Sequence, residues 1–294
     1  MPEGKIVKAL SGFYYVLDGN RKVQCRGRGI FRKNKITPLV GDEVVYQAEN
    51  DLEGYILEVK DRKNELIRPP ISNVDQAILV FSALEPEFSP VLLDRFLVLI
   101  EANEIEPIIC ISKMDLLEDK GGKSRLESYI RDYRDIGYHV VLTSALEEES
   151  LQPLLPFFQE RISVFAGQSG VGKSSLLNAL KPELELKTND ISNHLGRGKH
   201  TTRHVELIHV GDGLVADTPG FSSLDFTDIE VEELSYCFPE MRKKSADCKF
   251  RACTHTAEPK CAVKAAVETG GITEHRYKNY LSFLEEIKDR KPRY

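Results

Sequence analysis

The sequence predicts a multidomain protein with an N-terminal all-β barrel, a central α/β sheet and a C-terminal α-helical domain. Short β-like runs separated by Gly, Asn and Asp turns fill the first 68 residues, and apolar strands then alternate with helical segments as far as residue 226. Three cysteines and a histidine crowd together in the helical remainder. A chain of 294 residues with 41% hydrophobic content can bury a core in each part.

The N-terminal domain, residues 1–68, holds the strand-like runs "KIVKAL", "GFYYVL", "RKVQCRG", "DEVVYQ" and "GYILEVK". Their spacing predicts a small barrel or sandwich, and we expect an OB-fold. The stretch from Gly19 to Gly41 has no acidic residue and seven basic ones, although the net charge of the chain is −6. That net charge argues against a protein that coats nucleic acid throughout, and the basic run is either a solvated loop or a local phosphate-binding surface.

The central domain, residues 69–226, follows a predicted linker, "RPPISN", whose paired prolines favour extended backbone. "VDQAILVF" and "PIICIS" are typical of buried parallel strands, and Ser89 with Pro90 predicts the start of a helix between them. "YHVVLTSA", "RISVFAG", "VELIHV" and "LVADTPG" are further strand candidates, and helices are expected near 124–136 and 173–180. This alternation predicts a doubly wound sheet with ligands at the carboxyl ends of its strands.

A phosphate-binding loop is predicted by "GQSGVGKSS", which fits G-x-x-x-x-G-K-[ST] between an apolar strand and a helical run. The glycines let backbone N–H groups point at phosphates, Lys173 supplies a point charge, and the Ser174 hydroxyl can ligate Mg²⁺. The predicted nucleotide-binding residues of this loop are Gly167, Gln168, Ser169, Gly170, Val171, Gly172, Lys173, Ser174 and Ser175.

The motif "DTPG" predicts the other side of the phosphate site. Asp217 ends a strand and would hold Mg²⁺ through its water shell, and the Gly220 N–H would contact the γ-phosphate. Between the two motifs, "NHLGRGKHTTRHVE" is polar and broken by glycines, which suits a switch whose threonine reaches the metal when a triphosphate is bound. Thr201 and Thr202 are both candidates for that ligand.

The motif "SKMD", formed by Ser112, Lys113, Met114 and Asp115, predicts the base that the site binds. It follows a strand, so it falls on the binding edge, where the Asp115 carboxylate can accept both the N1–H and N2–H₂ donors of guanine. The Lys113 stem would pack over the ring, and "TSA", with Ser144 and Ala145, could donate a backbone N–H to guanine O6. GTP and GDP are therefore favoured over ATP, and a P-loop ATPase is the disfavoured alternative.

The order of these motifs is rotated. In ordinary GTPases the phosphate loop comes first, whereas here the base-reading motif and "TSA" precede it. A sheet tolerates such a rotation if the original termini lie close enough to join. We therefore expect a circularly permuted P-loop GTPase domain.

A metal site is predicted by Cys248-x₄-Cys253-x-His255-x₅-Cys261. Four such ligands in one short segment can close a tetrahedral zinc site without an open position, hence a structural one. A disulfide framework is disfavoured because the remaining cysteines are dispersed. The surrounding third domain, residues 227–294, is expected to be helical over "DIEVEELSYCFPEM" and from 273 to 290.

With "SKMD", "TSA", "GQSGVGKSS", "GKHTTR" and "DTPG" in that order before the Cys/His cluster, nearly the whole chain resembles the RsgA family of circularly permuted bacterial GTPases, also called YjeQ or YloQ. The resemblance implies a GTP hydrolase with one zinc ion, and Mg²⁺ with its GTP, that binds the small ribosomal subunit and its rRNA. It implies a role in late subunit assembly, with hydrolysis stimulated by the subunit. Ser112 departs from the Asn that commonly begins the family's base-reading motif, and we expect Asp115 to preserve guanine preference.

The resemblance also implies a catalytic residue. Phe221 stands where Ras-like enzymes carry the glutamine that orients the attacking water, so the family pattern points to His200 beside the switch threonines. The alternative is a GTP-switched rRNA-binding checkpoint module with incidental hydrolysis. Family grounds favour rRNA contact by the basic run, through Arg26, Arg28, Arg32, Lys33 and Lys35.

The sequence contains no apolar run long enough to cross a bilayer, and its N-terminus "MPEGKIVKAL" lacks the apolar stretch of a secretory signal. We expect a monomeric protein of the cytoplasm with no membrane partner.

Overall fold

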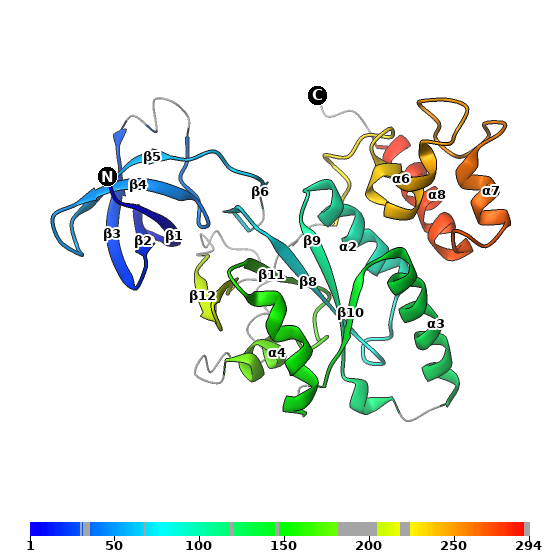
Figure 1. Ribbon diagram of the computed structural model, residues 1–294, viewed down its shortest axis with the longest axis horizontal. Helices are drawn as coiled ribbons and strands as arrows, with labels where there is room; N and C mark the ends of the chain where they lie inside the picture. The colour runs from blue at the N-terminus through cyan, green and yellow to red at the C-terminus, as the bar shows by residue number, and fades with distance from the viewer. Residues whose placement is uncertain are drawn as a thin grey trace.

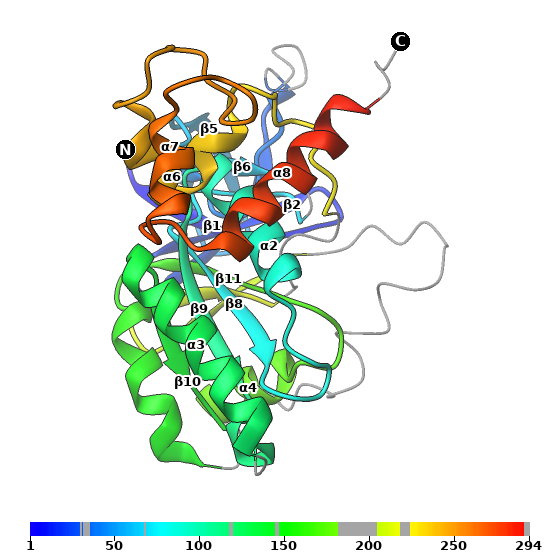
Figure 2. The ribbon, with the colours of Figure 1, turned by 90° about the vertical axis from the view of Figure 1, so that its right-hand side faces the viewer.

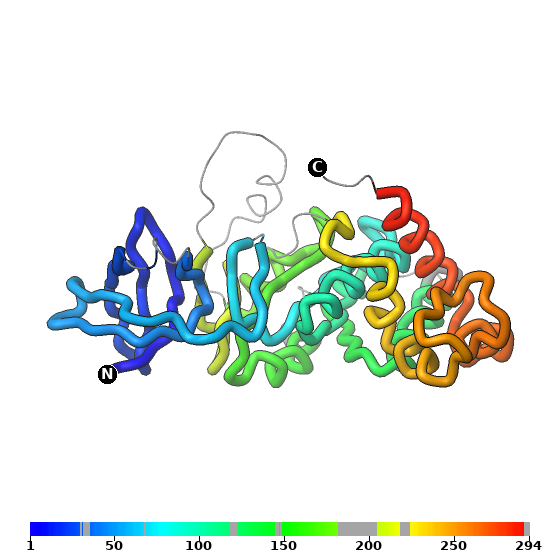
Figure 3. The backbone as a smooth tube through the Cα atoms, turned by 90° about the horizontal axis from the view of Figure 1, so that it is seen from above, coloured from blue at the N-terminus to red at the C-terminus, as the bar shows by residue number. Residues whose placement is uncertain are grey.

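The computed structural model arranges a barrel, a sheet and a group of helices in a row, with the sheet in the middle (Figure 1, Figure 3). This confirms the predicted fold class. No helix in the described part of the chain has both the length and the apolar character needed to cross a membrane. The residues that the structure describes are 1–29, 31, 36–67, 69–117, 120–144, 147–181, 205–217 and 224–290.

Five strands close the N-terminal barrel in the order β1-β2-β3-β5-β4, with β1 also paired to β4, as in an OB-fold. Alternate side chains point inward, so Ile6, Val16, Val23 and Ile56 are fully buried. The barrel that the sequence predicted is therefore confirmed. Its strands are β1 (Glu3–Leu10), β2 (Phe13–Asp18), β3 (Arg21–Gly27), β4 (Glu43–Ala48) and β5 (Gly54–Val59).

The connection between barrel and sheet is more ordered than the double proline suggested. Two short strands, β6 (Glu65–Leu66) and β7 (Ile71–Ser72), pair in antiparallel fashion. Ser72 is fully buried and its hydroxyl donates to Asp42 Oδ1 at 2.6 Å. Arg62 Nε donates to the same oxygen at 2.7 Å, so the predicted linker is fastened to the barrel rather than free.

The central sheet has the order β10-β9-β8-β11-β13-β12, in which every neighbouring pair is parallel except β13 with β12. Only Gly211 and Asp212 separate the last two strands, too few for a crossover, so they form a hairpin. The doubly wound sheet is confirmed with one antiparallel edge. Its strands are β8 (Gln76–Ser82), β9 (Glu106–Ser112), β10 (His139–Leu142), β11 (Ile162–Ala166), β12 (Leu207–Val210) and β13 (Gly213–Ala216).

Side chains of β8 alternate between two cores on opposite faces of the sheet. Leu79 and Phe81 belong to the core that contains most of the buried apolar residues of α2 (Pro90–Ala102) and those of α3 (Lys120–Ile136). Ile78 and Val80 belong to the core that contains those of η2 (Glu148–Phe158) and α4 (Lys173–Leu180). The predicted start of α2 is also confirmed, because Ser89 Oγ accepts a hydrogen bond from the Leu92 N–H at 3.4 Å.

The C-terminal part is built from short helical elements. The segment "DIEVEELSYCFPEM", expected to be helical, is helical only in part: Pro239 cannot continue a helix and instead begins the second of two separate short elements. The helix expected between 273 and 290 is confirmed. The elements are η4 (Leu234–Cys237), α6 (Pro239–Ser245), α7 (Ala262–Glu268) and α8 (Glu274–Lys288).

A buried polar network fixes these helices to the sheet domain, and α8 lies alongside α2 (Figure 2). Arg276 is fully buried and donates to Asp94 Oδ1 at 2.5 Å and to Glu240 Oε1 at 2.7 Å. Asn279 Nδ2 and the Tyr133 hydroxyl also donate to the Asp94 carboxylate, at 2.6 and 2.7 Å. Buried charges are tolerated when they are paired and hydrogen-bonded in this way, so α8 is held on α2 and α3 in a defined orientation.

Candidate nucleotide site and metal centre

The phosphate loop joins the end of β11 to the start of α4, the context that the sequence predicted. Gly167, Gly170 and Gly172 have φ angles of +135°, +81° and +94°, which side chains rarely adopt. A Cβ at Gly167 would lie 2.1 Å from the carbonyl oxygen of Val80, so only glycine lets the loop pass β8. The loop therefore curls tightly over the carboxyl end of the sheet.

Lys173 points into this loop. Its side chain is largely buried, and Nζ donates to the carbonyl oxygens of Gly167, at 2.8 Å, and Gln168. Burial lowers the pKa of Lys173 to about 8, because a charged amine loses its hydration. An anion bound in the loop would oppose this shift by stabilising the ammonium. The neighbouring Ser174, also buried, lies in the first turn of α4.

The base-reading motif lies directly against the phosphate loop. Ser112 is the last residue of β9, and its hydroxyl donates to the Val171 carbonyl oxygen at 2.6 Å across 59 residues of sequence. The same hydroxyl lies 3.2 Å from the carbonyl oxygen of Phe81. Ser112, at the position where the family's motif commonly has Asn, thus forms a direct hydrogen bond to the loop.

The rest of "SKMD" turns along the same edge. Lys113 adopts a left-handed conformation with φ +57°, and Asp115 follows within the short helix η1 (Met114–Leu116) with its side chain exposed. The Met114 N–H donates to the Thr143 carbonyl oxygen at 3.2 Å, which ties this motif to the end of β10. "SKMD", the first residues of "TSA" and the phosphate loop therefore share one edge, where the strand order reverses around β8.

Sequence reasoning missed Ser150, which shapes the "TSA" turn. Its Oγ accepts from the Ser144 N–H at 2.8 Å and lies 2.8 Å and 2.7 Å from the carbonyl oxygens of Ser144 and Glu147. Ser150 lies near the start of the 3₁₀ segment η2, which contains two prolines, and no motif marks it. In this structure the Ser144 N–H therefore donates its hydrogen bond to the Ser150 side chain.

Asp217 follows β13 at the same carboxyl edge, beside the strand that leads into the phosphate loop. The Asp217 N–H donates to the Glu206 carbonyl oxygen at 2.9 Å, and the Glu206 N–H donates to Asp217 Oδ1 at 2.9 Å. Glu206 is a second residue that sequence reasoning did not single out. Its backbone fixes the predicted magnesium-binding carboxylate from the edge of the sheet.

Of the basic run, Arg26 and Arg28 are exposed, and Arg26 Cζ lies 4.9 Å from the centre of the Phe13 ring. The predicted site residues that lie outside the described residues are Ala145, His200, Thr201, Thr202, Gly220, Arg32, Lys33 and Lys35, together with Phe221.

The predicted metal ligands converge. One donor atom from each of Cys248, Cys253, His255 and Cys261 lies within 4.8 Å of all the others. Cys248 Sγ is 3.9 Å from Cys261 Sγ and 3.7 Å from His255 Nδ1. The distance between His255 Nδ1 and Cys261 Sγ is 3.3 Å. A tetrahedral zinc site with bonds of about 2.3 Å needs ligand separations of about 3.8 Å, so this Cys₃His cluster is consistent with a structural zinc.

Ser245 orients the histidine of this cluster. Its hydroxyl donates to the Met241 carbonyl oxygen at 2.8 Å, so it accepts from His255 Nε2–H at 3.1 Å and leaves Nδ1 with its lone pair toward the sulfurs. Burial lowers the pKa of His255, which favours the neutral ring that a metal requires. Burial also raises the pKa of the Cys253 thiol to about 12, and a bound cation would reverse that shift.

Helix α8 braces the loop that carries these ligands. The Tyr277 hydroxyl donates to the His255 carbonyl oxygen at 2.6 Å, and the Tyr280 hydroxyl donates to the Thr254 carbonyl oxygen at 2.7 Å. Burial would raise the pKa of Glu258, but hydrogen bonds from the Thr254 side chain and nearby backbone N–H groups outweigh it and lower the pKa to about 2. The ligand loop is therefore held by hydrogen bonds from two sides.

A parallel-stranded sheet that carries a P-loop and a base-reading motif on one edge, with the base-reading motif earlier in the chain, defines a circularly permuted P-loop GTPase fold. The RsgA GTPase family model matches residues 59–227, and the RsgA N-terminal domain model matches residues 3–56. The chain belongs to the RsgA GTPase family.

Close relatives span the whole chain. It is 69% identical over 298 residues to the small ribosomal subunit biogenesis GTPase RsgA of Bacillus subtilis (strain 168), with 100% of each chain covered. Identity to the protein of the same name from Bacillus anthracis is 72% over 294 residues, again with 100% of both covered.

Two solved structures are similar over nearly their full length. The structure of YloQ, described as a circularly permuted GTPase, superposes with a TM-score of 0.88 at 64% identity and covers 100% of this chain and 97% of its own. YjeQ from Thermotoga maritima has a TM-score of 0.88 at 39% identity, with 99% of each chain covered.

Proposed function

We propose that the protein is a GTP hydrolase that binds the small ribosomal subunit and its rRNA and acts in late subunit assembly. The observation that carries the enzymatic part is the 2.6 Å hydrogen bond from Ser112 to Val171, because it brings the base-reading motif and the phosphate loop to one site. The names of relatives at 69% and 72% identity support the ribosomal part. We propose that the protein acts in the cytoplasm, where ribosomal subunits are assembled, and that it is a monomer, because one chain supplies the whole predicted nucleotide site.

In this proposal Asp115 reads guanine, Lys113 packs over the base, and Ser144 and Ala145 border it. Mg²⁺, when bound with GTP, neutralises charge on the phosphate oxygens; Ser174, Asp217 and one of Thr201 and Thr202 would hold it. The Gly220 N–H contacts the γ-phosphate, and His200 orients the attacking water. The other nucleotide-binding residues are Ser112, Met114, Gly167, Gln168, Ser169, Gly170, Val171, Gly172, Lys173 and Ser175.

The proposed domains are residues 1–68 for rRNA binding, 69–226 for GTP and 227–294 for zinc. The zinc domain would hold one ion through Cys248, Cys253, His255 and Cys261, with no ligand position left for a substrate. The metal's role in this domain is therefore structural.

Small ribosomal subunits are expected to accelerate single-turnover GTP hydrolysis by about 10²- to 10⁴-fold, the effect of positioning one proton-transferring group. The physical reason is that docking orders the switch and brings His200 to the attacking water. The measurement compares the isolated protein with the protein saturated by small subunits, and large subunits serve as the control. Equal rates would contradict the proposal and favour the rRNA-binding checkpoint with incidental hydrolysis, to which Phe221 at the glutamine position gives weight.

The rRNA surface is proposed on the outer face of the barrel. Phe13 of β2 pairs with Arg26 of β3, and Arg26 pairs with Tyr55 of β5, whose side chain is 53% exposed. An arginine between two aromatic rings suits phosphate contact combined with base stacking. We propose that Arg26 acts there together with Arg28, Arg32, Lys33 and Lys35.

Neutralising Arg26, Arg28 and Arg32 to Gln is expected to weaken subunit binding and to flatten its salt dependence. Each lost phosphate contact reduces the slope of log K against log salt by about 0.7–0.9, because fewer counterions are released on binding. The measurement is subunit affinity over a series of salt concentrations, with Lys5→Gln on β1 as the control. A slope that the triple substitution leaves unchanged would exclude this surface.

A further inference from the structure

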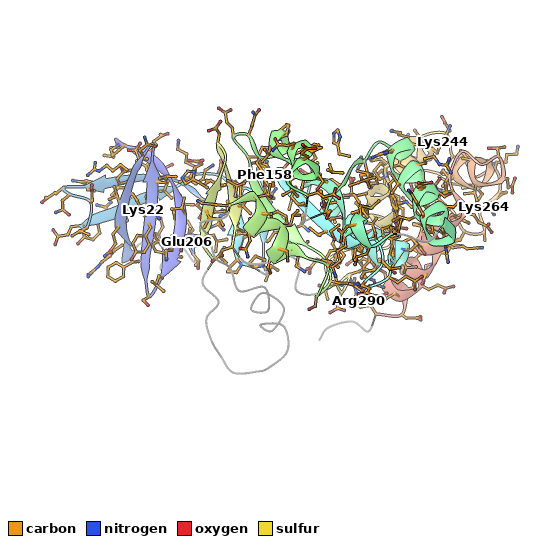
Figure 4. The ribbon with its side chains drawn as sticks, turned by 90° about the horizontal axis from the view of Figure 1, so that it is seen from below. Lys22, Phe158, Glu206, Lys244, Lys264 and Arg290 are labelled. Carbon is orange, nitrogen blue, oxygen red and sulfur yellow. The ribbon has the colours of Figure 1, made fainter. Side chains whose placement is uncertain are left out.

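The barrel touches the sheet at Glu206, the residue just before β12. Lys8 of β1 forms an isolated antiparallel bridge with Glu206, and Lys8 Nζ lies 2.5 Å from Glu206 Oε2. The other carboxylate oxygen, Oε1, lies 3.7 Å from Nζ of Lys22. Figure 4 shows Lys22 of β3 and Glu206 at this junction. Each oxygen of one carboxylate therefore faces a lysine of the barrel.

The backbone of the same residue holds Asp217. The Glu206 N–H and carbonyl oxygen each form a 2.9 Å hydrogen bond with Asp217, the N–H to the Oδ1 atom of the carboxylate. A displacement of Glu206 would thus remove a hydrogen bond from Asp217 Oδ1 and let the carboxylate turn. Glu206 bridges two parts of the molecule, with its side chain on the barrel and its backbone on the proposed metal site.

The ion pair between Lys8 and Glu206 is only partly exposed to solvent. The side chains of Lys8 and Glu206 are 29% and 28% exposed, so water and salt screen them less than a fully exposed pair. The hydrogen bond to Glu206 raises the pKa of Lys8 and keeps its amine charged. Lys5, on the same strand as Lys8, forms an ion pair with Glu43 at 3.2 Å, and both of these residues belong to the barrel.

We propose that Glu206 is a positioning residue that couples the barrel to the magnesium site. Lys8 and Lys22 fix the Glu206 side chain, and the Glu206 backbone fixes the Asp217 carboxylate; this rests on the proposed role of Asp217.

The Mg²⁺ concentration that half-saturates GTP binding tests the coupling in the full-length protein. Glu206→Gln, and Lys8→Met combined with Lys22→Met, are each expected to raise that midpoint by about two- to fivefold, the range of a modest ion pair. All three substitutions together should shift it no further than either set, because they break one shared contact. Lys5→Met is the matched control and should leave the midpoint unchanged. Glu206→Gln removes one charge from a partly exposed side chain of nearly the same shape, so it is expected to fold normally.

If the unaltered protein needs Mg²⁺ for GTP binding while both variant sets match Lys5→Met, the coupling is wrong and the proposed function stands. If GTP binding in the unaltered protein does not depend on Mg²⁺, the proposed role of Asp217 fails, and the coupling fails with it.

Discussion

Removal of zinc is expected to unfold the C-terminal part of the protein while GTP binding persists. Metal binding at such a site contributes on the order of 10 kcal/mol, whereas α6 and α7, of seven residues each, are too short to be stable without tertiary support. Cys253→Ser removes one of the four clustered ligands, so it should release the ion and have the same effect on the C-terminal part. GTP binding is retained because the phosphate loop and "SKMD" lie in the sheet domain, which has cores of its own.

The measurement combines zinc content, circular dichroism and GTP affinity, before and after treatment with a chelator. Cys237→Ala is the matched control, since Cys237 is buried in the same part of the chain but is not a member of the cluster. It should keep the zinc and most of the helical signal. Full zinc content in Cys253→Ser, or an unchanged helical signal after the metal is removed, would overturn the structural assignment.

His200→Ala is expected to lower the subunit-stimulated rate of GTP hydrolysis by about 10²- to 10⁴-fold with little change in GTP affinity. An oriented imidazole acts on the attacking water and makes no contact that binds the nucleotide. Because Phe221 offers no hydrogen bond, loss of His200 leaves the water without a proposed partner.

The measurement compares single-turnover rates of GTP hydrolysis by His200→Ala and by the unaltered protein, each with saturating small subunits. His209→Ala is a suitable control, because His209 is an exposed residue of β12 outside the proposed site. Rates of that variant should match those of the unaltered protein. If His200→Ala also keeps the full stimulated rate, the residue has no part in the mechanism.

Local sequence patterns predicted the elements that bear the site. The range 173–180 matches α4 to the residue, because a glycine-rich loop and an apolar strand define where that helix must begin. "PIICIS" and "RISVFAG" became β9 and β11, and both are buried on two faces, as continuous apolar runs require. The four metal ligands were found from spacing because they are close in sequence.

Features that depend on distant partners were missed. The stretch "RPPISN" reads as a linker, yet its Ser72 donates a hydrogen bond to Asp42, 30 residues away, and Arg62, shortly before it, donates to the same carboxylate. Ser150 and Glu206 act through hydrogen bonds to backbone groups or through their own backbone, and such contacts leave no residue pattern to recognise. Pro239 was included in a helical run, although the missing N–H places it at the start of one.

The proposed function depends on Asp115 and Lys173 binding the same guanine nucleotide although Asp115 comes first in the chain. The most direct test is the affinity of Asp115→Asn for GTP and for XTP, with Lys173→Ala as its companion. Xanthine has a carbonyl where guanine has its amino group, so an Asn amide can pair with it as the Asp carboxylate pairs with guanine. Asp115→Asn should lose GTP affinity by about a hundredfold or more and gain affinity for XTP, while Lys173→Ala should lose affinity for both. Asp115→Asn that binds GTP as tightly as the unaltered protein would contradict a shared site.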